Sequence, residues 1–320
     1  MNKEPIRVLS LFSGLGAFEK ALTNRNIDYE VVNYSEINTI FAKAYSILHN
    51  VDIQRNLGDV SKVKELDMPT NIDLMTWGFP CINFSKANKS KNRKGLDGNG
   101  SGLYYEGLRF LKQIKPKYSI IENVSDLATD EKFKDHYDLI ISDLSECGYK
   151  SYSLIMNCSD YGLAQNRLRI FIVSIRNDIK KEIVMPAKIE LKYKAKDLFD
   201  KQVEDKFYNI NPKIIDKVKT HKNRSLDICP TITRAIGRAG SSKEYIANCA
   251  FVYSNIGELR RMTPCETLKF MGFDEVDYHK LKNGGISDTA IYNMAGNSIA
   301  VPVLETLYSQ LFYKNIRVGE

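Results

Sequence analysis

Short apolar runs alternate with amphipathic stretches through the first half of the chain, and this alternation constrains the fold more than any other feature. Apolar runs of about four to eight residues predict buried strands, and apolar residues repeating every three or four positions predict helices. Strands that alternate with helices form βαβ units, so we predict an α/β fold with a doubly wound, mostly parallel sheet. The expected strands are 6–12, 29–36, 71–79, 117–124, 151–157 and 168–175, and the expected helices are 14–24, 38–50, 102–114 and 137–148.

The composition changes after about Arg176, where a lysine-rich stretch with weak periodicity begins. Helical periodicity returns only in 258–273 and 298–316. A chain of 320 residues is long enough for one large or two modest domains. We therefore predict a larger domain, formed by residues 1–190 plus 293–320, and a smaller, irregular domain, formed by residues 191–292.

The bulk properties exclude several classes of protein. No apolar run reaches the length of a membrane span, and the N-terminus lacks the pattern of a secretion signal. Six cysteines contain no CxxC pair, which argues against a zinc site and predicts reduced thiols in a cytoplasmic protein with no bound metal. The net charge of +7 permits a polyanionic partner without demonstrating one.

The first two expected strands are each followed by residues suited to a nucleotide ligand. Gly14 and Gly16 allow a backbone to approach a ligand closely, and Glu36 ends the second strand, where ribose hydroxyls bind in such folds. Asp59 lies ahead of the third strand, within reach of an adenine amino group. The glycines alone are equally typical of a tight turn, and Glu36 of a surface acid. Because a third glycine is missing, a nucleoside without phosphates fits better than a dinucleotide.

The third and fourth expected strands end in residues that can react. Cys81 follows Pro80 directly after a strand, at the edge of the sheet where ligands bind in open α/β folds. Its thiol needs activation, since the thiolate is the nucleophile. Glu122 ends the next strand, where partial burial raises the pKa of a carboxyl and suits it to proton donation. A buried core cysteine and a helix-capping carboxylate are the ordinary alternatives.

Two arginines precede the last apolar run. Period-2 alternation places Gln165, Arg167 and Arg169 on one face of a strand, with Leu168 and Ile170 on the other. Two arginines on one sheet face can hold a polar ring or a phosphate. A solvated edge strand is the ordinary explanation.

These segments occur together in a characteristic order. They are LFSGLGAFEKAL, SEIN, GDV, GFPCINFS, SGLYYEGLRFLKQIKPKYSIIENV, QNRLRIFIV, ELRRMTPCETLKFMGF and AGNSIAVPV. In order and spacing the chain resembles the cytosine-5 DNA methyltransferases, prokaryotic or phage modification methylases, over nearly its whole length outside roughly 177–255. Two departures are Ile82-Asn83, where the family usually has glutamine first, and Ala17, where glycine is common.

The resemblance implies a mechanism on the fold of S-adenosylmethionine-dependent methyltransferases. Cys81 would attack carbon 6 of cytosine, so that carbon 5 takes a methyl group from S-adenosylmethionine. Glu122 would bind nitrogen 3 and the exocyclic amine, and Arg169, with Arg167 nearby, would fix the base carbonyl. The resemblance also assigns further residues to the cofactor pocket: Phe12, Gly14, Gly16, Glu36, Ile37, Asp59, Val60, Pro80, Leu103, Asn297 and Ser298.

The implied partner is double-stranded DNA, in the cleft between the two lobes. The reaction cannot occur inside a stacked duplex, so the cytosine has to be flipped out. A basic loop follows Cys81, and the smaller domain, with 229–245, is expected to recognise the target sequence. The expected DNA-binding residues are Ser85, Lys86, Lys89, Lys91, Arg93, Arg234, Arg238, Ser241 and Ser242.

Three alternatives stay open at this point. A tRNA cytosine-5 methyltransferase shares the Glu-Asn-Val element, although its Cys-Phe-Thr tripeptide is missing here. A catalytically idle DNA-binding regulator would need neither Cys81 nor Glu122, and a nicotinamide oxidoreductase would need a phosphate-binding fingerprint. We expect a monomer, since the cleft forms within one chain, with a cognate restriction endonuclease acting separately.

Overall fold

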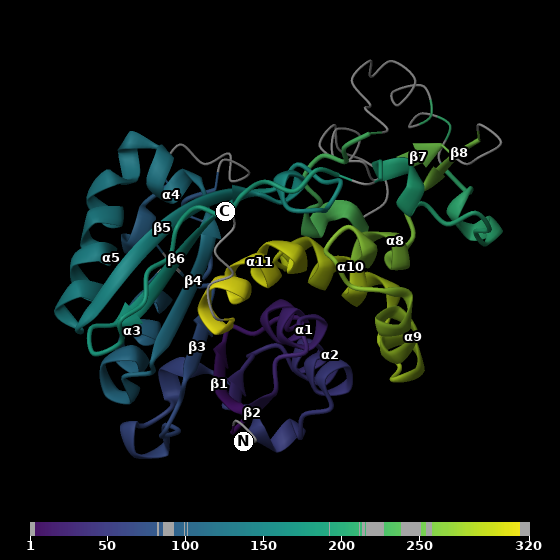
Figure 1. Cartoon of the computed structure of the whole chain (residues 1–320). Coiled ribbons are helices and arrows are strands. Elements are labelled where there is room, and N and C mark those ends of the chain that lie inside the picture. The colour runs from purple at the N-terminus through teal and green to yellow at the C-terminus, as the bar shows by residue number, and fades with distance from the viewer. Residues whose placement is uncertain are drawn as a thin grey trace.

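A six-stranded sheet forms the centre of the molecule, with helices on both faces (Figure 1). The computed structural model describes residues 4–81, 83–85, 93–98, 100, 102–191, 193–210, 212, 215, 227–237, 251–253 and 258–313. The strands are β1 (Ile6–Leu11), β2 (Tyr29–Ser35), β3 (Leu74–Trp77), β4 (Tyr118–Val124), β5 (Tyr149–Asn157) and β6 (Leu168–Arg176).

The strand order is β2-β1-β3-β4-β6-β5. β1 pairs in parallel with β2 and β3, and β3 pairs in parallel with β4. β6 is antiparallel to both β4 and β5, because a short connection returns the chain from β5 directly into its neighbour. The prediction of a doubly wound, mostly parallel α/β sheet is confirmed, and the carboxyl ends of β1 to β4 meet at one edge.

Both faces of the sheet are buried, which explains why its central strands are continuous apolar runs. Successive side chains point to opposite faces. Val8, Leu74 and Ile120 join one core, and their neighbours Leu9, Met75 and Ile121 join the other. Each helix buries its apolar stripe against one of these two cores.

The helices divide between the faces (Figure 1). The first core takes apolar residues from α1, α2, α8, α9, α10 and α11, and the second from α3, α4 and α5. Their bounds are α1 (Ala17–Asn24), α2 (Thr39–His49), α3 (Leu103–Ile114), α4 (Asp126–Thr129), α5 (Lys134–Glu146), α8 (Pro264–Lys269), α9 (Glu275–Asn283), α10 (Asp288–Asn297) and α11 (Val301–Phe312). Within the described ranges, every helix is too short or too polar to cross a membrane.

Side-chain caps fix where key helices begin. Asn38 Oδ1 accepts hydrogen bonds from the backbone N–H groups of Ile40 and Phe41, at 3.0 and 3.2 Å, and starts α2 directly after β2. Thr263 and Glu266 form a reciprocal capping box at the start of α8, with Pro264 in the first turn. The expected helical segment 258–273 therefore begins differently, because Leu259–Arg261 forms strand β8 instead.

A second, smaller unit lies beyond β6. Its two-stranded sheet pairs β7 (Phe251–Tyr253) with β8 (Leu259–Arg261), and its core gathers Ile232, Ile236 and Phe251. Figure 1 shows β7 and β8 standing away from the main sheet, beyond α8. This region is the expected location of the smaller domain.

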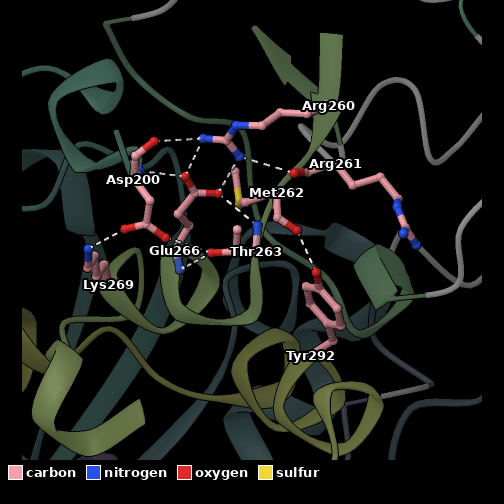
Figure 2. A network of polar contacts seen from close by, with 8 residues as sticks. All are labelled: Asp200, Arg260, Arg261, Met262, Thr263, Glu266, Lys269 and Tyr292. Carbon is pink, nitrogen blue, oxygen red and sulfur yellow. Dashed lines mark hydrogen bonds and ion pairs between the residues drawn. The ribbon is translucent and has the colours of Figure 1, made fainter. Parts of the chain in front are cut away.

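A buried ion pair ties this unit to the helices below it (Figure 2). Arg260 of β8 and Glu266 of α8 pair at 2.6 Å with side chains 1% and 0% exposed. Asp200 donates its backbone N–H to Glu266 Oε1 at 2.7 Å and accepts from Thr263 and Lys269. Because both side chains of the pair have further hydrogen-bonding partners, the network fixes β8 and α8 relative to each other and to Asp200, about 60 residues earlier in the chain.

The core assignments bear on the expected boundary between the domains. Leu268 of α8, Leu281 of α9 and Met294 of α10 pack in the same core as α1 and α11. The expected smaller domain, 191–292, includes these helices, whereas their burial places them with the larger unit. We propose that the boundary lies between β8 and α8, where the network of Figure 2 joins the two units.

Candidate active site

A cavity of about 400 Å³ opens at the carboxyl ends of β1 to β4. Its position is the one expected for ligands in an open α/β sheet. The described residues that line it are Phe12, Gly14, Ser35, Glu36, Ile37, Phe41, Gly58, Asp59, Val60, Gly78, Phe79, Pro80, Cys81, Leu103, Glu122, Val124, Arg167, Arg169, Arg234, Gly296 and Asn297. The expected nucleophile and most of the expected cofactor residues therefore share one cavity.

Cys81 is half-buried in a turn that its neighbours fix from both sides. Its carbonyl oxygen accepts hydrogen bonds from the backbone N–H groups of Phe84 and Ser85, at 2.9 and 3.0 Å. On the other side, the buried Asn123 side chain of β4 donates to the carbonyl oxygen of Phe79 at 3.2 Å. The Glu-Asn-Val segment thus contributes the Glu122 carboxyl to the cavity, and its Asn123 side chain stabilises the turn that carries the Cys81 thiol.

Glu122 and Arg169 form an ion pair beside this thiol. Arg169 Nε lies 3.1 Å from Glu122 Oε1, and the two side chains are 17% and 14% exposed. Burial raises the pKa of Glu122, while the charges of Arg169 and Arg167 oppose that rise. Burial also raises the pKa of the Cys81 thiol, and the negative charge of Glu122 adds to the rise. Neutralising Glu122 therefore favours the thiolate.

Glu122→Gln is expected to lower the pKa of Cys81 relative to the wild type, because the variant removes a negative charge and leaves both arginines in place. The measurement is the rate of Cys81 alkylation by iodoacetamide against pH, followed on the Cys81 peptide by mass spectrometry. Glu106→Gln, which removes a carboxylate paired with Arg109 on α3, is the control and should leave the midpoint unchanged. An unchanged midpoint in Glu122→Gln would show that the carboxylate and the thiol do not interact.

Arg167 lies differently from the alternation predicted for it. β6 begins at Leu168, so Gln165 and Arg167 precede the strand instead of sharing a sheet face with Arg169. The Arg167 side chain is buried, and it donates to the carbonyl oxygens of Ile232, at 2.8 Å, and Ser298, at 2.5 Å. Its pKa is lowered to about 9 by burial and by the charge of Arg169. Arg167 thus joins the smaller unit to the end of α10.

The opposite end of the cavity carries two acids. Glu36 accepts hydrogen bonds from the backbone N–H groups of Gly14, at 3.0 Å, and Asn38, at 2.8 Å, while burial raises the pKa of its carboxyl. Hydrogen bonds from Ser61 lower the pKa of Asp59, which caps the turn after it. Among the described lining residues the arginines all belong to the Cys81 end or the smaller unit. Asp59 has a cation nearby, the exposed Lys62 at 3.9 Å, and the two carboxylates at this end suit hydroxyl and amino donors better than phosphate.

Gly16 and Ser298 are expected cofactor residues that do not line the cavity. Gly16 has a left-handed backbone, φ 76°, at the start of α1, and a Cβ built on it would lie 2.1 Å from His49 Nε2. Ser298 ends α10 and holds Arg167 through its carbonyl oxygen. Both residues shape the elements around the cavity.

The expected DNA-binding residues are only partly described. Lys86, Lys89, Lys91, Arg238, Ser241 and Ser242 lie outside the described residues. Arg234 is exposed at the mouth of the cavity. Arg93 instead donates to the carbonyl oxygen of Phe84 at 2.7 Å and pairs with Asp130 at 3.0 Å, so in this structure its guanidinium links Phe84 to Asp130. Ser85 closes the turn at Cys81 through its backbone.

Several lining residues were not predicted from the sequence: Ser35, Phe41, Gly58, Gly78, Phe79, Val124 and Gly296. Gly78 and Phe79 were predicted as the end of strand 71–79, whereas β3 ends at Trp77 and they lie between it and Pro80. Their position next to Pro80 and Cys81 was the available signal. A Cβ on Gly78 would lie 3.4 Å from Glu122 Oε2, and this glycine therefore leaves room for the acid. Phe41 belongs to α2, and the apolar pattern of this helix does not indicate that Phe41 faces a cavity.

Comparisons with known proteins agree with this geometry. The family model for the C-5 cytosine-specific DNA methylases matches residues 6–313. The chain is 28% identical to the orphan methyltransferase M.SPRI of Bacillus phage SPR, across 97% of this chain and 98% of that protein. It is 27% identical to the type II methyltransferase M2.ScrFI of Lactococcus lactis subsp. cremoris, across 96% and 99%. The solved structure of the S. pombe Dnmt2 methyltransferase, 21% identical, superposes with a TM-score of 0.72 over 96% of this chain and 98% of that one, which supports the fold alone.

Proposed function

The chain belongs to the C-5 cytosine-specific DNA methylase family, and on this premise we propose that it transfers a methyl group from S-adenosylmethionine to carbon 5 of a flipped-out cytosine in a specific sequence of double-stranded DNA. One observation carries the assignment of residues. Cys81, Glu122 and Arg169 converge at one end of a single cavity, and Glu36 and Asp59 lie at its other end.

The chemistry follows from the positions of the three side chains. The Cys81 thiolate forms a bond to carbon 6 of cytosine, and the electron pair displaced from the ring makes carbon 5 nucleophilic. Glu122, whose pKa is raised by burial, gives or shares a proton with nitrogen 3 as that charge develops. Arg169 pairs with Glu122 and would donate to the base carbonyl. After methylation, carbon 5 would lose its proton to water, the double bond between carbons 5 and 6 would re-form, the Cys81 thiolate would leave, and nitrogen 3 would return its proton to Glu122.

The other half of the cavity fits a nucleoside cofactor. When bound, S-adenosylmethionine supplies an electrophilic methyl group. Glu36 would accept from the ribose hydroxyls, since two backbone N–H groups already orient its carboxylate. Asp59 would accept from the adenine amine, and the side chain of Ile37, 71% exposed in this structure, would cover the adenine ring. The remaining predicted residues of the cavity would contact the cofactor along its walls: Phe12, Val60, Pro80, Leu103 and Asn297.

We further propose that DNA binds between the larger and the smaller unit as the chain acts as a monomer, with any cognate endonuclease working separately. Arg234, an exposed residue that lines the cavity, would contact the substrate. Flipping the base out of the duplex costs a few kcal/mol, and contacts between the protein and the DNA phosphate backbone must offset this cost. We place the enzyme in the cytoplasm, where reducing conditions keep a thiol such as Cys81 available.

The test is transfer of a labelled methyl group from S-adenosylmethionine to unmethylated duplex DNA and, in parallel, to total RNA, followed by digestion to nucleosides. We expect labelled 5-methyldeoxycytidine from DNA and no labelled nucleoside from RNA. Label in RNA alone would contradict the DNA substrate and favour the tRNA methyltransferase. DNA binding without label in either would favour the catalytically idle regulator.

A further inference from the structure

His49, the last residue of α2, contacts the glycine turn that forms one wall of the cavity. Its Nε2 lies 3.0 Å from the carbonyl oxygen of Leu15, the residue between Gly14 and Gly16. Its ring packs on Tyr45 with centroids 4.8 Å apart, and Tyr45 in turn stacks on Tyr34 of β2 at 4.2 Å. The imidazole is therefore held against the turn by Tyr45, which Tyr34 supports in turn.

Gly16 is shaped to receive this imidazole. A Cβ on Gly16 would lie 2.1 Å from His49 Nε2 and 2.9 Å from a ring carbon of Tyr45, closer than real contacts allow. Its φ of 76° also belongs to the left-handed region, which favours glycine. The ring of His49 thus occupies the volume that any side chain at position 16 would need.

His49 stays in the protonation state in which its Nε2–H can donate to Leu15. Burial lowers the pKa of His49 to about 4. The positive charges of Lys20 and Lys280 also lower this pKa, and the negative charge of Asp277 raises it. The ring is therefore neutral near pH 7, and the acceptor opposite it requires the proton on Nε2. Leu15 is 2% exposed, so the carbonyl oxygen of Leu15 would lose its partner without His49.

The glycine turn is held from two directions. Glu36 accepts the N–H of Gly14 on the cavity side, and His49 donates to the carbonyl of Leu15 on the far side. We propose that His49 is a positioning residue for the cofactor: it holds the Gly14–Gly16 turn in the conformation that binds S-adenosylmethionine, without touching the cofactor. This inference rests on the proposed function.

The test compares His49→Phe, which keeps an aromatic ring and removes the donor, with His49→Gln, which keeps a donor. His49→Phe is expected to weaken binding of S-adenosylhomocysteine by about tenfold in calorimetry, the effect of losing one hydrogen bond to a buried acceptor. The KM for S-adenosylmethionine should rise by a similar factor, while kcat at saturating cofactor stays within about twofold. His49→Gln should restore most of the affinity.

Two further variants keep the test decisive. Ser46→Ala removes another side-chain bond at the same end of α2, from Ser46 Oγ to the carbonyl oxygen of Val51 at 2.6 Å, and should leave the affinity unchanged. Gly16→Ala displaces the ring without removing it and should weaken binding even if His49→Phe does not fold. Wild-type affinity in His49→Phe, or a loss confined to kcat, would overturn the inference. Failure of the wild type to bind S-adenosylhomocysteine would instead contradict the proposed cofactor.

Discussion

Cys81→Ser is expected to lower methyl transfer by roughly three orders of magnitude or more, as removal of a nucleophile does in enzymes with covalent intermediates. A serine hydroxyl has a far higher pKa than a thiol, and negative charge on the neighbouring Glu122 disfavours its ionisation further. The affinity for S-adenosylhomocysteine should stay within about threefold, because the oxygen replaces sulfur with little change in shape. Labelled methyl transfer to DNA and calorimetry measure the two quantities.

A second buried cysteine provides the matched control. Cys158 lies close to Arg167, and its thiol donates to the carbonyl oxygen of Gln165 at 2.9 Å. Serine at this position can make the same hydrogen bond, so Cys158→Ser should keep most of the activity. Equal losses in the two variants would show that Cys81 is one structural cysteine among several.

Gly296→Ala is expected to destabilise the protein and to weaken the cofactor site together. A Cβ on Gly296 would lie 2.1 Å from the backbone nitrogen of Arg234 and 2.2 Å from the carbonyl carbon of Thr233. Alanine within α10 gains about 1 kcal/mol of helix propensity, whereas overlap with main-chain atoms, which cannot rotate away, costs up to about 3 kcal/mol. We therefore expect a net loss of about 2 kcal/mol in the free energy of unfolding, measured by urea denaturation.

The functional part of this prediction follows from the neighbours of Gly296. Asn297 and Arg234 both line the cavity, so moving α10 away from the turn at Arg234–Gly237 enlarges it. Binding of S-adenosylhomocysteine and turnover should both fall. Gly102→Ala is the control, since its Cβ would meet nothing closer than the carbonyl oxygen of Leu96 at 4.0 Å. Wild-type stability in Gly296→Ala would contradict the close contact between α10 and the smaller unit.

Much of the sheet and of the reactive end of the cavity could be predicted because their signals are local. A strand buried on both faces is a continuous apolar run; Cys81 lies four residues beyond the end of β3, and Glu122 lies near the carboxyl end of β4. Parallel strands then bring their carboxyl ends to one edge, so the two residues meet although 41 positions separate them. The topology of the sheet thus predicts that Cys81 and Glu122 lie close together, although they are far apart in the sequence.

The features that were not predicted depend on partners far along the chain. Arg167 bonds to residues 65 and 131 positions away, and no period-2 pattern reveals those acceptors. Arg93 was expected to bind DNA from its charge, whereas Asp130 and the carbonyl of Phe84 hold it in this structure. The place of α8 to α10 in the larger core depends on which helix face meets α1 and α11, which charge and composition do not show.

The most direct test of the central claim is a search for the covalent adduct at Cys81. Duplex DNA that carries 5-fluorocytosine in place of cytosine would be incubated with the enzyme and S-adenosylmethionine. Because fluorine at carbon 5 cannot leave as the proton does, elimination stalls and the bond to carbon 6 persists. We predict a DNA–protein complex that withstands denaturation, with the modified cytosine mapped by mass spectrometry to Cys81 and no complex in Cys81→Ser. Attachment at another residue, or no complex while unsubstituted DNA of the same sequence is methylated, would contradict the account.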